Sequence, residues 1–204
     1  DGIQIVDEGA TGERTLFIEY NTIDSSGAAA IGLVDSVTEE NFSGASVKDR
    51  IYLFNNTLAA NHYGVTGGDN LVALNNLVIA TKMTALKNID GTSIVSHSLL
   101  WNNGVDFEQC TVDSATILTA PPSISPNLQY DAGSFGIDGG TAFFVWRGDT
   151  VLDMPPEAYL GAAPDIGAFE YVPVTGVRAA EEPAPTTFLL LSNYPNPFNA
   201  QTRM

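Results

Sequence analysis

The side chains of widest chemical use in this sequence are two histidines and one cysteine, and they lie well apart. His97 occupies a position that comparable segments fill with Asn55 and Asn75, so it is either a general base or a replacement for a structural amide. No carboxylate accompanies it in its own segment, which favours the structural interpretation. His62 and the single Cys110 do not complete a zinc site with it, and one cysteine excludes an internal disulfide.

Aromatic side chains are the second candidate chemistry, because their flat faces can stack on a ligand such as a sugar ring. The predicted ligand-stacking residues are Trp101, Trp146, Tyr63 and His97. Core packing is the competing interpretation, since Trp101 follows two leucines and Trp146 lies in the run TAFFVWRGDT. The sequence contains no phosphate loop, nucleophile elbow or dinucleotide fingerprint, so we predict no catalytic, cofactor-binding or metal-binding residues.

The elements that would position these residues are short repeats. Four segments align, FIEYNTIDSS at 17–26, LFNNTLAANH at 53–62, ALNNLVIATK at 73–82 and VSHSLLWNNG at 95–104. The aligned column is Asn21, Asn56, Asn76 and Ser98, with spacings of 35, 20 and 22 residues. We predict a structural ladder of hydrogen-bonded amides, because Asn tolerates left-handed turns and buried polar groups need partners. The wide first gap predicts an inserted loop at 41–50, a suitable place for a variable binding element.

The repeats predict an all-β fold of the parallel β-helix solenoid type. Each repeat is a short apolar or β-branched run closed by turn residues, and only stacking buries its apolar side. From about residue 111 the chain becomes rich in Pro, Gly, Ser and Asp, which predicts irregular coils and an end-cap over the solenoid. The predicted domains are the C-terminal part of a β-helix at 1–172, a linker at 173–187 and a separate tail segment at 188–204.

Charge and hydropathy exclude some partners. With 8 basic and 24 acidic residues the net charge is −16, which repels phosphates and argues against a nucleic-acid partner. No stretch reaches the roughly 18 apolar residues of a membrane span. The first twenty residues lack a basic region followed by an apolar run, so we predict an internal or processed segment without a signal peptide.

Four stretches of the sequence resemble two known families. The stretches GIDGG at 136–140, GAAPDIGAFEY at 161–171 and SLLWNNGVDF at 98–107 resemble the late coils and closing segment of secreted bacterial right-handed parallel β-helix proteins with a pectin-lyase-like fold. LSNYPNPFNAQTRM at 191–204 resembles the opening of the C-terminal sorting domain of the type IX secretion pathway in Bacteroidota-like bacteria, truncated here. The resemblance implies secretion, or a place on the outer cell surface of a Gram-negative bacterium, with the type IX machinery as a partner of the tail.

The resemblance to pectin-lyase-like proteins also implies a polysaccharide as the ligand class, but only by analogy of fold. Uronate lyases of this fold class use a basic residue as the base and acidic residues that hold Ca²⁺, so calcium stays open as a cofactor. The Asp residues here fall mainly in turns, and no two acids recur in adjacent repeats as a glycosidase would need. We therefore predict a carbohydrate-binding or structural segment. The alternatives are a lyase or hydrolase whose cleft lies in further N-terminal coils, and an adhesin.

Overall fold

The computed structural model describes residues 1–6, 14–34 and 49–173. The chain divides into two compact units, Asp1–Val172 and Pro173–Met204, so the described residues belong almost wholly to the first. Their regular structure consists of strands and a single short 3₁₀ helix, η1 (Pro156–Ala158). No helix in these ranges is long and apolar enough to cross a membrane. The predicted linker at 173–187, apart from residue 173, and the predicted tail at 188–204 lie outside the described residues.

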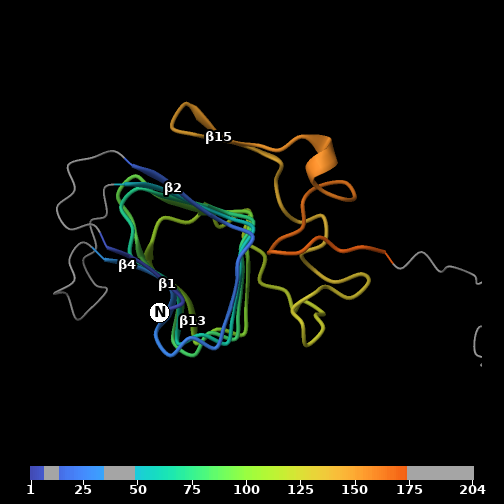
Figure 1. Ribbon diagram of the computed structural model, residues 1–204, viewed down its shortest axis with the longest axis horizontal. Helices are drawn as coiled ribbons and strands as arrows, with labels where there is room; N and C mark the ends of the chain where they lie inside the picture. The colour runs from blue at the N-terminus through green and yellow to red at the C-terminus, as the bar shows by residue number, and fades with distance from the viewer. Residues whose placement is uncertain (7–13, 35–48, 174–204) are drawn as a thin grey trace, which may run out of the picture. The chain divides into compact units, whose positions relative to one another are not determined.

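Three parallel sheets make up the body of the described structure. Sheet A contains, in spatial order, β1 (Ile3–Val6), β4 (Ala29–Val34), β7 (Tyr63–Thr66), β10 (Thr84–Ile89) and β13 (Val105–Cys110). Sheet B contains β2 (Thr15–Glu19), β5 (Arg50–Phe54), β8 (Leu71–Leu74) and β11 (Ile94–Ser96). Sheet C contains β3 (Thr22–Asp24), β6 (Thr57–Ala59), β9 (Leu77–Ile79) and β12 (Leu99–Trp101). Seen down the stack, successive turns of the chain lie over one another on three sides (Figure 1).

Each strand pairs in parallel with the strand one turn further along the chain. In sheet B the partners run Ile18↔Leu53, Leu53↔Ala73 and Ala73↔Val95, which reproduces the spacings of the sequence repeats. The all-β prediction is confirmed, and the stacked parallel sheets fit a β-helix-like fold. The register matters for function, because it decides which side chains from distant segments become neighbours on the outer faces.

The core lies inside the three sheets and is made of one to three apolar side chains per strand. In sheet C the middle residue of each short strand points inward, and Leu58, Val78 and Leu100 are almost completely buried. At the corner between sheets B and C, one residue per turn adopts a left-handed conformation: Tyr20, Asn55, Asn75 and His97 have φ values of 56, 52, 57 and 45°. Asn tolerates this backbone region, and here the side chains of Asn55 and Asn75 donate to the backbone oxygens of Asp165 and Thr141.

The expected end-cap at 111–172 needs correction. Residues 111–118 do continue the stack, through single parallel bridges Val95↔Val112 and Leu99↔Leu118. The following residues, 119–172, which we call the closing segment, instead turn to the side of the stack (Figure 1). Ile166 packs with Leu77 and Leu99 on the outer face of sheet C.

Another part of the closing segment, which precedes Ile166 in the chain, covers sheet B. The antiparallel hairpin of β14 (Phe143–Trp146) and β15 (Asp149–Asp153) places Phe144, Trp146, Val151 and Leu152 against this sheet. Beneath the hairpin lie Phe54, Val72, Leu74 and Ile94. The physical reason for the correction is that the outer faces of sheets B and C carry apolar side chains, and burying them is as favourable as covering the end.

Candidate functional site

The column Asn21, Asn56, Asn76 and Ser98 lies at the corner between sheets B and C. Asn56 Oδ1 accepts hydrogen bonds from Asn21 N at 3.0 Å and Asn21 Nδ2 at 3.1 Å. Asn56 Nδ2 donates to Ile18 O, Phe54 O and Asn76 Oδ1. These amides are consumed by the fold, so they cannot serve a ligand.

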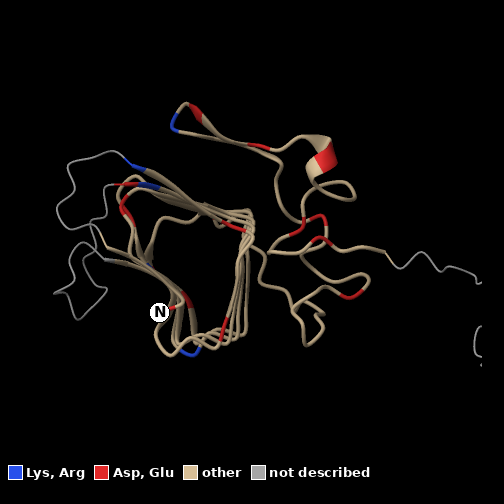
Figure 2. Ribbon diagram, in the orientation of Figure 1, with Lys and Arg blue, Asp and Glu red and all other residues tan. Residues whose placement is uncertain are grey.

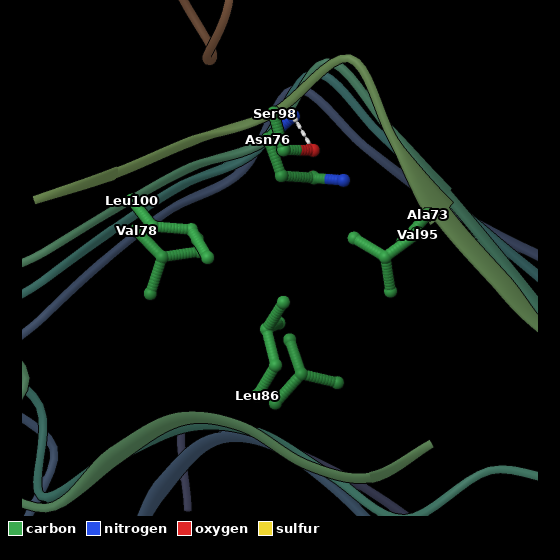
Figure 3. A pocket seen from close by; sticks show the side chains of 8 residues that line it. Ala73, Asn76, Val78, Leu86, Val95, Ser98 and Leu100 are labelled. Carbon is green, nitrogen blue, oxygen red and sulfur yellow. Dashed lines mark hydrogen bonds between the residues drawn. The ribbon is translucent and has the colours of Figure 1, made fainter. Parts of the chain in front are cut away.

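Asn76 repeats this pattern one turn later, and Ser98 ends it. Asn76 Oδ1 accepts from Asn56 N at 3.0 Å, and its Nδ2 donates to Leu53 O and Leu74 O. Ser98 Oγ accepts from Asn76 N at 3.2 Å and donates to Ser96 O. Figure 3 shows both side chains pointing into the stack, next to a cavity of about 10 Å³ with otherwise apolar walls. Such a space suits about one water molecule and is too small for a substrate.

A second, discontinuous ladder at the other end of sheet C was not predicted from the sequence, and it is interrupted at Thr81, whose Oγ1 has no hydrogen-bond partner. Asn61 Oδ1 accepts from Ser26 N at 2.8 Å, and Asn103 Oδ1 accepts from Thr81 N at 3.0 Å. Asn61 and Asn103 also donate to Ile23 O and Val78 O, respectively. The signal for this ladder is faint, because Ser, Asn, Thr and Asn alternate in its column.

His97 takes part in a hydrogen-bonded group at the outside of the ladder corner. Its Nδ1 lies 2.8 Å from Ser96 Oγ, which also contacts Thr116 Oγ1 at 2.9 Å. Its ring meets Phe144 edge to face, with centroids 5.8 Å apart. Burial lowers the pKa of His97, against an opposing effect of the Asp113 charge, so the neutral ring is favoured. Ser96 is fully buried, which places its hydroxyl out of reach of a substrate and gives the pair a structural role.

The structure does not bring the predicted ligand-stacking residues together. Trp146 belongs to the hairpin and faces sheet B, and its Nε1 donates to Thr92 O at 2.8 Å. Trp101 lies at the end of β12 and is 39% exposed. Tyr63 starts β7 in sheet A, in contact with His62 and 5.9 Å from Lys87 Nζ. Trp146 and His97 therefore lie near the outer face of sheet B, whereas Trp101 lies in sheet C and Tyr63 lies in sheet A.

An aromatic pair on sheet B, with one ring exposed and the other partly buried, is the best candidate for a ligand surface. Phe17 in β2 and Tyr52 in β5 are direct register partners, and their ring centroids are 4.9 Å apart at an interplanar angle of 34°. Phe17 is 61% exposed. Tyr52 also lies 5.3 Å from Phe54, and the Arg50 guanidinium lies 6.0 Å from the Tyr52 ring centre. We call Phe17, Tyr52 and Arg50 the aromatic platform.

The platform is the part of the outer face of sheet B that the hairpin leaves open. Val72 and Ile94 continue the column of Phe17 and Tyr52, and both are buried beneath the hairpin. Basic residues are scarce in this acidic chain, yet some lie close to β2 (Figure 2). Arg14 forms an ion pair with the buried Asp49 at 2.6 Å, joining the starts of β2 and β5. Of the predicted inserted loop, residues 41–48 lie outside the described residues.

Sequence reasoning missed the platform because its two rings are distant in the chain. Phe17 and Tyr52 are separated by the same wide gap as Asn21 and Asn56. Extending the repeat alignment backward from that asparagine column would have paired them. The two tryptophans, which are larger and more conspicuous in the sequence, lie instead in the last turn and in the closing segment.

Three carboxylates hold the closing segment together. Asp165, almost fully buried, accepts hydrogen bonds from Asp138 N at 2.7 Å and Tyr171 N at 2.5 Å. Glu170 accepts from Asp165 N and Leu160 N, and Asp138 accepts from Ala162 N at 2.7 Å. Burial raises the pKa of Asp165 and of Glu170. Their oxygens are occupied by backbone amides, which gives them a structural role.

Metal and thiol chemistry find little support in the described ranges. No group of three or more His, Cys, Asp or Glu side chains there is arranged to hold a metal ion. Cys110 is partly buried, and burial raises the pKa of its thiol, which keeps the sulfur protonated and poorly nucleophilic.

Comparisons with known proteins give no further guide to the site. No family model, no curated protein and no solved structure matches this chain.

Proposed function

We propose that this chain is a non-catalytic segment of an exported β-helix protein that binds carbohydrate on the aromatic platform. The observation that carries the proposal is the Phe17–Tyr52 pair, two rings in tilted contact on adjacent strands with Phe17 mostly exposed. A large exposed aromatic surface is costly in water and marks binding sites more often than a random surface. The other apolar side chains in the same column are covered by the hairpin, so the open rings are a specific feature of this end.

The chemistry of the platform suits a sugar chain. Flat aromatic faces pack against the apolar C–H faces of sugar rings, and Tyr52 adds a hydroxyl that can hydrogen-bond. Arg50 supplies fixed guanidinium donors beside the rings for sugar hydroxyls or a carboxylate. Both rings stand on paired strands, so little side-chain and backbone freedom is lost on binding.

We further propose that the parent protein is a secreted or outer-surface protein of a Gram-negative bacterium with a right-handed, pectin-lyase-like β-helix. The support is the GAAPDIGAFEY motif at 161–171 and the YPNPFN motif at 194–199, which resembles a type IX sorting signal. The second motif lies outside the described residues. In this proposal the tail is read by the secretion machinery, while residues 1–172 face the medium. Antibodies against 1–172 that label lysed cells but never intact cells or medium would contradict it.

A glycan-array screen of this chain, with calcium and then with a chelator, tests carbohydrate binding. We expect binding that Phe17→Ala and Tyr52→Ala each weaken at least tenfold, since each removes one face of the platform. Phe143→Ala is the matched control, because Phe143 is a similarly exposed aromatic on the outer side of the hairpin. Binding that all three variants retain would remove the platform from the proposal.

The same screen separates recognition from catalysis. Each glycan that binds is incubated with the chain and analysed for shortened or unsaturated products. Unchanged glycan supports a recognition module. Calcium-dependent binding to uronates with unsaturated products would instead show a lyase, and the non-catalytic proposal would be abandoned.

A further inference from the structure

The last strand of sheet A, β13, has an open edge. It pairs with β10 on one side, and it ends the strand order of sheet A in the described part of the chain. Sheets B and C are continued past their last strands by Val112 and Leu118, whereas no bridge among these residues continues sheet A. An unpaired strand edge presents free N–H and C=O groups and is a template for another strand.

The side chains of β13 indicate that this edge is a docking surface. Phe107 lies in register with Leu86, which lies in register with Val65. Leu86 and Val65 are 2% and 3% exposed, yet Phe107 is 47% exposed, because no strand formed by the described residues lies above it. Val105, on the same strand, is 49% exposed. Phe107, whose register partners in the two preceding strands are buried in the core, therefore lies at the surface next to a free backbone edge.

Charge on the strand defines the chemistry of the occupant. Glu108 is the register partner of Lys87, and its carboxylate lies 3.4 Å from Lys87 Nζ. The Glu108 side chain is 46% exposed, so its second oxygen can accept a cation from the opposite side. A second copy of this chain is disfavoured, because the acidic β13 strands and two net charges of −16 would face each other.

We infer that the β13 edge binds an extended, basic segment of another protein by β-strand addition. The segment would carry an apolar side chain level with Phe107, followed by Lys or Arg level with Glu108. Main-chain hydrogen bonds along β13 would supply affinity, and these two side-chain positions would supply selectivity. This edge is separate from the aromatic platform, which lies on sheet B.

A peptide that copies the natural neighbour of β13 tests the inference. The probe is a fluorescent peptide of residues 84–91, TALKNIDG, whose β10 portion already pairs with β13 inside the stack. A second peptide carries Lys87→Glu. Fluorescence anisotropy with the full chain should show about tenfold tighter binding of the lysine peptide, because the cross-strand charge pair changes from attraction to repulsion.

Exchanging the charge on the protein gives the decisive comparison. Glu108→Lys should reverse the order of the two peptides, and Glu108→Gln should bind them about equally. Glu157→Lys is the matched control, since it changes the same charge at an exposed site in η1 and should leave the lysine preference intact. Phe107→Ser should weaken both peptides. Circular dichroism and thermal melting identify any variant that fails to fold.

Three outcomes would overturn the inference. The first is no binding of either peptide to the native chain. The second is binding without a charge preference, or with a preference that Glu157→Lys changes as much as Glu108→Lys. The third is self-association of the native chain, seen by sedimentation and abolished by Phe107→Ser, which would make a second copy the occupant of the edge.

Discussion

Replacing Asn56 by alanine should cost more stability than any other single change in the ladder. The Asn56 side chain is fully buried and takes part in five hydrogen-bond contacts, two through Oδ1 and three through Nδ2. Not every partner is orphaned by the change. Phe54 O still accepts from Tyr20 N, and Asn21 Nδ2 still donates to Glu19 O.

The expected cost follows from the side-chain hydrogen bonds that are lost. Asn21 N loses its side-chain acceptor, and Ile18 O loses its side-chain donor. At about 0.5–1.5 kcal/mol for each lost bond, with the higher values for buried partners, Asn56→Ala should lower the free energy of unfolding by roughly 3–5 kcal/mol. For a unit of this size that corresponds to a Tm decrease of about 10 °C.

Urea unfolding followed by circular dichroism, together with calorimetry, measures this change. The control is Asn21→Ala, at the half-exposed end of the ladder, where only two donor contacts through Nδ2 are lost. It should cost about 1 kcal/mol or less. A loss for Asn56→Ala below about 1 kcal/mol, or equal to that of Asn21→Ala, would refute the view that the buried amides hold the turns together.

Two further substitutions test the corner of the last turn. Ser98→Asn should raise the free energy of unfolding by about 1 kcal/mol in the same urea assay, because the longer amide can fill the adjacent cavity and donate to Ala73 O and Ser96 O, as Asn76 does one turn earlier. A decrease would show that the last turn cannot accept a ladder amide. His97→Asn should gain stability relative to the native chain as the pH falls below about 6.5, the ordinary pKa of histidine. The folded-state pKa of His97 is lowered, so its protonation opposes folding at acidic pH, and thermal melts between about pH 5 and pH 8 that show no such divergence would contradict this.

The sequence predicted those parts of the fold that repeat a residue type at regular spacing. The asparagine column could be aligned because its members are chemically alike, and the aligned segments became neighbouring strands. In the column of Ser26, Asn61, Thr81 and Asn103, only the two Asn side chains accept hydrogen bonds from the backbone of the preceding turn, so no run of identical residues revealed the column. The aromatic platform was not predicted for a related reason, because Phe17 and Tyr52 pair across the wide gap between the first two repeats.

The placement of the closing segment could not be predicted for a different physical reason. Its turn residues describe local backbone geometry, and turn chemistry does not specify which surface a segment will cover. Ile166 is fully buried, but an isoleucine in GAAPDIGAFEY would be equally well buried against the end of the stack or against its side. The position of the closing segment depends on the outward-facing apolar side chains of sheets B and C. These side chains can be recognised only from the strand register.

The side-on course of the closing segment also determines how a pulling force would enter the molecule. Gly167 N donates to Asn75 O at 2.7 Å, and Ala168 N donates to Thr57 Oγ1 at 2.9 Å. Tension applied to the chain at residue 173 would therefore load two interior turns of the stack in shear, several bonds at once. If the chain left directly from the last turn of the stack, the same tension would peel off one strand at a time. The side-on course of the closing segment therefore makes the stack more resistant to mechanical unfolding.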